Sequence, residues 1–312
     1  MKLHCRRQLR TLSCAIAASS VILGTVVATA AVSPGVASAA QRPLCVGTAA
    51  APGVLAGNYR SGVRIEGFCT VNGGATVVRG RLTISANSAL IAAFALNDLT
   101  GKGSSKLTVL GGIFVANGGT LVLGCLASSF ACVDDPNPSA PTLAEADVVR
   151  GSIRAQSPLG VIVHDTTIYG NVIESGGGGG TTCAVPTTGP FALFGSPVYS
   201  DFEDSAIHGD LTLSDLKTCW MGVARVVDSG SATLTDNKTA DPDAIEILTN
   251  TIVGDLSCNK NTSVWDSEEA AFGQTGVYPR TPEPDTVDGS RIGQCVLASP
   301  ATEGGSPGPG PF

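Results

Sequence analysis

Acidic side chains gather in one short stretch of the sequence, where an enzyme could use them. Asp201, Glu203 and Asp204 precede His208 and Asp210. On a β-strand, residues two apart share a face, so Asp201 with Glu203, and His208 with Asp210, would each form a pair on a solvent face. Exposed carboxylates act as acids and bases in glycosidic bond cleavage, or as calcium ligands. The candidate catalytic residues are therefore Asp201, Glu203, His208 and Asp210, and the alternative is a solvated strand end without activity.

Other catalytic patterns receive little support. His164 and Asp165 are adjacent, so on a strand they would face opposite sides and would not form a direct pair. The glycine run 176–180 lacks the Lys-Ser/Thr ending of a phosphate-binding loop, and the sequence has no Gly-x-Ser-x-Gly nucleophile motif. Four aromatic residues, Tyr199, Trp220, Trp265 and Tyr278, would either stack on sugar rings or cover the ends of a coil.

The elements that would position these residues are indicated by a repeat. A five-residue unit recurs in which an apolar residue, glycine and a second apolar residue occupy the first, third and fifth positions. Its copies are residues 65–69, 78–82, 109–113, 122–126, 149–153, 168–172, 207–211 and 252–256. In a strand these three positions would face the interior, where glycine marks a bend or a close backbone approach. The repeat therefore predicts stacked coils with tight corners.

The spacing of the repeat indicates the length of a coil. Gly151, Gly170 and Gly209 are 19 and 39 residues apart, which indicates coils of about 20 residues with some coils altered. Asn72-Gly73-Gly74 returns as Asn117-Gly118-Gly119, and this triplet permits the positive φ that turns a chain between strands. Because hairpins also use Asn-Gly, an antiparallel β-sandwich is the alternative. The repeat and the low aromatic content, 5%, favour an all-β, single-domain, right-handed parallel β-helix with loop insertions.

Stacked coils would also align outward residues in rows. Asn171, Asp210 and Asp255 occupy the same position of their units. Like charges one coil apart would repel by on the order of 1 kcal/mol in water, and a bound calcium ion would relieve this repulsion. The row is either a solubilising ladder or a calcium site, and calcium is the one cofactor that the sequence leaves open.

The units resemble those of secreted actinobacterial proteins with a parallel β-helix fold. The resemblance rests on units such as Ile207-His208-Gly209-Asp210-Leu211 and on turns such as Asn117-Gly118-Gly119-Thr120, and it covers roughly residues 60–295. Many proteins of that group have no assigned role, so the resemblance implies architecture rather than activity. Bactofilin filaments have a similar coil pattern, but they are cytoplasmic and poor in cysteine, unlike this chain.

The first 39 residues have the three parts of a secretory signal peptide. A basic start that includes Arg6-Arg7 is followed by an apolar stretch and by Ala37-Ser38-Ala39. Polar residues dilute the apolar stretch, which disfavours a membrane anchor, so we expect no stable membrane span after cleavage. Both general and twin-arginine export are compatible with the basic start. We therefore expect a secreted, extracellular protein that is soluble or associated with the cell wall.

Removal of this segment changes the charge and the cysteine count. It leaves 15 Lys and Arg against 26 Asp and Glu, a net charge of −11, which disfavours nucleic acid and anionic lipid as partners. The even number of remaining cysteines indicates disulfides. They are Cys45, Cys69, Cys125, Cys132, Cys183, Cys219, Cys258 and Cys295. No Cys-x-x-Cys occurs, so we expect no metal site, and Cys125 and Cys132 are close enough to pair locally.

Three segments of the chain have distinct expected roles. Residues 1–39 would be the signal peptide, 40–300 the β-helix and 301–312 a disordered Gly/Pro-rich tail. Insertions at 134–142, after Gly176 and at 265–284 would lie outside the coils and carry any binding function. The expected function is a secreted or cell-surface structural or interaction protein, with a cell-surface glycan or protein as partner. The alternative is an extracellular polysaccharide lyase or glycoside hydrolase on the same scaffold.

Overall fold

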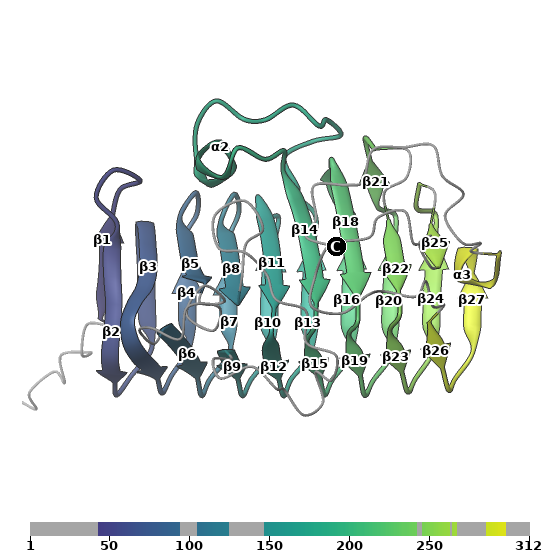
Figure 1. Cartoon of the computed structure of the whole chain (residues 1–312), viewed down its shortest axis with the longest axis horizontal. Helices are drawn as coiled ribbons and strands as arrows, with labels where there is room; N and C mark the ends of the chain where they lie inside the picture. Colours follow the sequence, from purple (N-terminus) through teal and green to yellow (C-terminus); the bar gives the residue numbers. More distant parts are fainter. Residues whose placement is uncertain are drawn as a thin grey trace, which may run out of the picture. The chain divides into compact units, whose positions relative to one another are not determined.

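The computed structural model describes residues 43–93, 105–124, 147–241, 245–262, 264–266 and 285–297. These residues form a parallel β-helix in which each strand pairs with the equivalent strands of the coils before and after it (Figure 1). Apart from the short helices α2 (Pro190–Phe194) and α3 (Gln294–Leu297), the regular elements are strands. All strand pairs in the described part of the chain are parallel, so the predicted β-helix is confirmed and the antiparallel sandwich is wrong.

The strands form three strips that run along the stack of coils. The first strip contains β1 (Leu44–Gly47), part of β3 (Val63–Val78), β4 (Leu82–Ile84), β7 (Ile113–Val115), β10 (Ile153–Gln156), β13 (Val172–Ser175), β16 (Leu211–Ser214), β20 (Ala232–Thr235), β24 (Leu256–Asn259) and β27 (Arg291–Gly293). The second contains β2 (Gly53–Tyr59), more of β3, β5 (Ala89–Ala93), β8 (Thr120–Gly124), β11 (Gly160–His164), β14 (Tyr199–Glu203), β18 (Trp220–Ala224), β22 (Glu246–Leu248) and β25 (Trp265–Asp266).

The third strip contains the ends of β2 and β3, followed by β6 (Ser105–Val109), β9 (Asp147–Val149), β12 (Thr166–Ile168), β15 (Ala206–Ile207), β19 (Val227–Asp228), β23 (Thr251–Ile252) and β26 (Thr286–Val287). A separate small sheet pairs β17 (Lys217–Thr218) with β21 (Lys238–Thr239). The strips enclose an aliphatic interior in which equivalent Val, Ile and Leu side chains stack from coil to coil. This stacking removes apolar surface from water along the whole helix.

The repeated unit proves to be a corner rather than one strand. In most copies the first apolar residue ends a strand of the third strip, and the second begins a strand of the first strip. In two such units, Ile168 and Val172, and Ile207 and Leu211, are fully buried, which confirms their inward assignment. The central glycines stack on one another, since a Cβ on Gly170 would meet the backbone and side chain of Ser152 in the preceding coil, and also the backbone of Gly151. Glycine is thus required by the close approach of successive corners.

Two copies of the unit lie elsewhere in the coil. Gly67 and Gly124 have positive φ, 74° and 82°, and neither is at the corner between the third and first strips. Asn117-Gly118-Gly119 forms the predicted turn, between β7 and β8. Residues 72–74 do not, because they continue within β3, where its pairing with β2 shifts register. A triplet that permits a turn therefore permits a bulge equally well.

The lengths of the coils are shown by hydrogen bonds at the same corner. Here a backbone N–H donates to a side chain at the equivalent position of the adjacent coil, with sequence separations of 19, 39, 21, 24 and 35 residues. A coil of about 20 residues with extended exceptions is therefore confirmed.

The extended coil of 39 residues contains the insertion after β13, residues 176–198, which includes α2 (Figure 1). Phe191 and Phe194 of α2 are buried against the outer face of the second strip, together with Ile162, Tyr199 and Trp220. These aromatic side chains contact one another edge to face. Tyr199 and Trp220, two of the aromatic residues considered as sugar platforms, are thus inside a second apolar cluster covered by the insertion, and Tyr278 lies outside the described residues.

Three disulfides join residues of the described part of the chain. Cys45 pairs with Cys69, Cys183 with Cys219, and Cys258 with Cys295. The second of these fastens the insertion to Cys219, directly before β18, and the third fastens α3 to β24. Cys125 and Cys132 lie outside the described residues, as do the predicted signal peptide, both predicted domain boundaries, the tail, the insertion at 134–142 and most of the insertion at 265–284.

Candidate functional site

The structure separates the four candidate catalytic residues into two unlike pairs. Asp201 and Glu203 lie in β14 and are both 0% exposed, so their expected place on the solvent face is wrong. His208 and Asp210 flank the corner glycine after β15 and are exposed. The reason is that the chain bends after β14 at Asp204, whose φ is 46°, and bends again at the corner. Alternation along a single strand therefore does not extend from Asp201 to Asp210.

Asp201 and Glu203 belong to a buried ionic cluster. Both side chains project from the outer face of the second strip, where His164 of β11 is the register partner of Glu203. His164 Nε2 lies 3.1 Å from Asp201 Oδ2, and His164 Nδ1 lies 3.5 Å from Glu203 Oε2. The imidazole is itself fully buried, so each of its nitrogens faces a carboxyl oxygen without access to bulk water.

Arg225 closes the cluster from the next coil. It occupies the bend after β18, and its φ of 54° is close to the φ of 46° of Asp204 at the equivalent bend after β14. Its Nη2 donates to Glu203 Oε2 at 2.9 Å and to Asp204 Oδ2 at 2.7 Å, and its Nε donates to Asp204 Oδ1 at 2.6 Å. This forked pairing is the geometry in which a guanidinium binds a carboxylate most strongly. Only 11% of the Arg225 side chain is exposed.

Burial controls the protonation of the carboxyls in this cluster. Loss of hydration raises the pKa of Glu203 to about 8, and the nearby Asp201 carboxylate adds to the effect, while His164 and Arg225 oppose it. The pKa of Asp201 is also raised well above its usual value, mainly by burial and against the pull of Arg225. At neutral pH Glu203 therefore retains a proton that an exposed carboxyl would lose.

The cluster does not fit a metal centre. His164, Glu203 and Asp204 bring possible ligand atoms within 4.8 Å of one another. However, the Arg225 guanidinium already binds both of these carboxylates, so a cation would have to displace it or share its ligands. A second grouping, Cys183, Cys219 and Asp241, does not fit either, because its cysteines form a disulfide.

Asp210 belongs to the predicted row of outward residues, and its carboxylate caps the backbone. Asn171, Asp210 and Asp255 do align, but Ser231 lies between the two aspartates. The carboxylates are thus two coils apart, about 10 Å, rather than one. Asp210 Oδ1 accepts from the N–H of Ser231, and Asp255 Oδ1 accepts from the N–H of Ser290. The repulsion that would have favoured calcium is weaker at this spacing.

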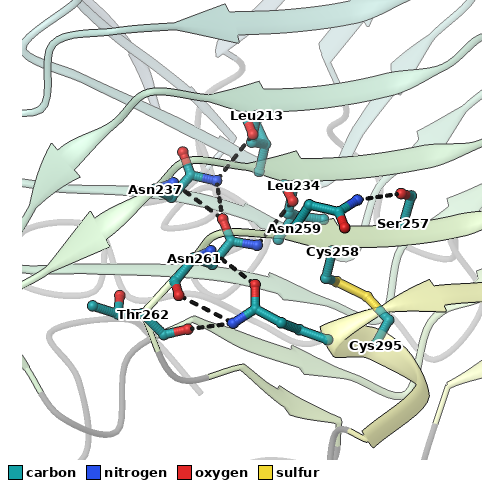
Figure 2. The surroundings of a disulfide bond; sticks show 10 residues. Leu213, Leu234, Asn237, Ser257, Cys258, Asn259, Asn261, Thr262 and Cys295 are labelled. Carbon is teal, nitrogen blue, oxygen red and sulfur yellow. Dashed lines mark hydrogen bonds between the residues drawn. A yellow bond between two sulfur atoms is a disulfide. The ribbon is translucent and has the colours of Figure 1, made fainter.

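Buried amides perform a similar role at another bend. Asn237 Oδ1 accepts from the N–H of Leu216, and Asn261 Oδ1 accepts from the N–H and the side chain of Asn237. Figure 2 shows these amides stacked beside the Cys258–Cys295 disulfide. Each amide satisfies backbone groups that the bend leaves without a strand partner, so the ladder supports the fold rather than a ligand.

A polar pair lies inside the aliphatic interior. Glu174 of β13 points inward between Ala155 and Leu213 of the adjacent coils, and Ser200 Oγ donates to Glu174 Oε1 at 2.7 Å. Burial raises the pKa of Glu174 to about 8, against the lowering effect of the Ser200 hydrogen bond. Its second oxygen has no hydrogen-bond partner. A protonated carboxyl is therefore the stable form in this position at neutral pH.

Sequence reasoning considered His164 only beside Asp165, and it missed Arg225 and Glu174. The pairing of His164 with Glu203 was within reach, because the corner units at 168–172 and 207–211 differ by 39 residues, as do His164 and Glu203. Applying the offset of 39 residues to the strand that precedes the corner would have aligned His164 with Glu203. Arg225 and Glu174 gave no such signal, since neither belongs to a repeated motif.

Comparisons with known proteins found no matching family model, curated protein or solved structure. Among the described residues, no helix has the length and apolar character needed to cross a membrane. The disulfides are compatible with an extracellular protein.

Proposed function

We propose that this protein is a secreted or cell-surface interaction protein that acts without catalysis, and that its β-helix holds an outer surface in fixed positions. The observation that carries the proposal is the burial of Asp201 and Glu203, which are paired with His164 and Arg225. A lyase or glycoside hydrolase needs its acid and base in contact with the sugar. A cluster closed to solvent serves as a buried ionic link between coils instead.

The exposed candidates also have structural roles. Asp210 caps the N–H of Ser231, and His208 stacks on the ring of Tyr169 with ring centroids 4.8 Å apart. The expected signal peptide and the three disulfides support export to an oxidising compartment, in the medium or at the cell wall. The resemblance to secreted actinobacterial β-helix proteins supports the same location.

A glycan-cleavage assay tests this proposal against the enzymatic alternative. Purified protein incubated with neutral and acidic glycans, with and without calcium, should release no new reducing ends and no unsaturated products. Asp210→Asn is the matched variant, because Asn171 already fills the equivalent position in its own coil and caps the next N–H. Turnover that disappears in Asp210→Asn, with an unchanged melting temperature, would overturn the proposal.

A further inference from the structure

The corner between the third and first strips carries a concentration of arginines, which we term the arginine corner. Its members are Arg60, Arg64, Arg79, Arg81, Arg150 and Arg154, and all six are exposed. They come from the first, second and fourth coils at this corner, with Leu110 and Phe114 in the third. The chain as a whole has a net charge of −7, so composition does not account for six cations on one edge.

The backbone ladder fixes the positions of these arginines. The N–H of Arg79 bonds to Tyr59 O, which stacks Arg79 on Arg60, and the N–H of Arg150 bonds to Val109 O. On the first strip, Arg64 and Arg154 belong to one row, joined through Thr83 and Phe114. Coils are about 4.8 Å apart, so the corner presents guanidinium groups over about 14 Å.

Most of these guanidinium groups are available to a ligand. Arg64 pairs with Glu66 at 2.9 Å. Arg60, Arg79, Arg81 and Arg154 make no ion pair with any residue in the described ranges.

Arg150 is held in place by aromatic contact. Its guanidinium lies 4.1 Å from the centroid of the Tyr169 ring, and that ring stacks on His208. Stacking against an aromatic face orients a guanidinium and leaves its N–H edge free to bind an anion.

The charge at this corner changes sign along the stack. Its later coils carry Asp210, Asp255 and Asp288, all exposed, whereas the equivalent positions of the first five coils hold no acid. The nearest acid in the early coils is Glu66, which lies two residues after Arg64 in β3 and pairs with it. A polyanion would therefore be attracted to the early coils and repelled from the late ones. An extended edge of repeated cations also suits a chain with repeated charges better than a single small anion.

We propose that the arginine corner binds a linear anionic polysaccharide. This inference rests on the proposed extracellular interaction function and gives that function a partner class. Guanidinium forks match both carboxylate and sulfate groups, so the charged group of the polymer is either of these. The arginine corner should not bind neutral glycans, because its affinity comes from pairing between the guanidinium groups and anionic groups of the polymer.

Binding to heparin, polygalacturonate and neutral dextran tests the proposal and distinguishes sulfate from carboxylate. The wild-type protein should bind at least one of the two acidic polymers, with affinity falling steeply as salt rises, and should not bind dextran. The double variant Arg79→Glu with Arg81→Glu should raise the Kd for the bound polymer by about tenfold or more. The matched control is Lys217→Glu with Lys238→Glu, which makes the same charge change on β17 and β21 and should bind as wild type.

Several outcomes would overturn the assignment. They are binding to neither acidic polymer, binding retained in the double arginine variant, or an equal loss in the lysine control. A second copy of the chain is the rival occupant, since an antiparallel arrangement would set Arg81 against Asp255. In that case light scattering would show a dimer that both Arg81→Glu and Asp255→Asn disrupt, whereas polymer binding predicts that Asp255→Asn leaves Kd unchanged. Cleavage of a bound polymer would refute the non-catalytic function while leaving the binding site intact.

Discussion

At the scale of single residues, Glu174 is the clearest source of pH dependence. Its folded pKa of about 8 lies above the usual value of 4.5, so between these pH values the folded state holds a proton that the unfolded state has lost. Its contribution to stability therefore decreases as pH rises through this window. At about 1.4 kcal/mol per pKa unit, the change is on the order of 5 kcal/mol.

Glu174→Gln should remove this dependence and keep the hydrogen bond with Ser200. In urea unfolding at about pH 5 and about pH 9, the free-energy advantage of the variant over wild type should grow with pH. Glu66→Gln is the control, because Glu66 is partly exposed and forms a surface ion pair worth less than about 1 kcal/mol. A difference between Glu174→Gln and wild type that stays constant with pH would contradict the assignment.

Arg225 is a second residue whose effect should depend on pH. Arg225→Met leaves Glu203 and Asp204 buried without their cation, which should cost about 3–5 kcal/mol at neutral pH. The cost should be larger above about pH 8, where Glu203 ionises and needs the cation most. Urea unfolding measures both values, and Arg154→Met, on an exposed arginine, should change stability by less than about 0.5 kcal/mol. Equal costs for the two variants would show that the cluster contributes nothing.

At the scale of elements, the corner glycines were the most predictable feature. Their spacing and the need for close backbone approach indicated tight corners, and these are observed. The strand assignment around Asp201 and Asp210 was not predictable from alternation, because bends at residues such as Asp204 and Arg225 use positive φ without glycine. Such bends are supported by partners in the next coil, which only the fold brings together.

Substitution of a corner glycine tests the stacking of elements directly. A Cβ at Gly170 would lie 2.6 Å from both Ser152 N and Ser152 Oγ, closer than real Cβ contacts. Gly170→Ala should therefore destabilise the protein by about 1–3 kcal/mol through overpacking. Denaturant unfolding measures the loss. Ser229→Ala, on an exposed corner residue of a later coil, should have little effect, and an equally mild Gly170→Ala would mean that the corners have room to move apart.

At the scale of the whole molecule, a solenoid fold makes stability local. Each coil contacts only its neighbours, so a change at one end should propagate weakly to the other. The sequence predicted this architecture because the repeated unit marks the corner of most coils. It did not predict the buried ionic cluster, because His164 meets Asp201 and Glu203, 37 and 39 residues later, across an insertion of unusual length.

The disulfide between Cys258 and Cys295 tests this locality. It joins β24 to α3 across a separation of 37 residues, and its loss should cost the last coils about 3–4 kcal/mol in the chain-entropy model. In the variant with both cysteines replaced by serine, hydrogen exchange should speed up in β26 and β27, whereas β10, β13 and β16 should keep their protection. Equal loss of protection in every coil would instead show that the β-helix unfolds as one cooperative unit, in which the C-terminal coil stabilises strands that it never touches.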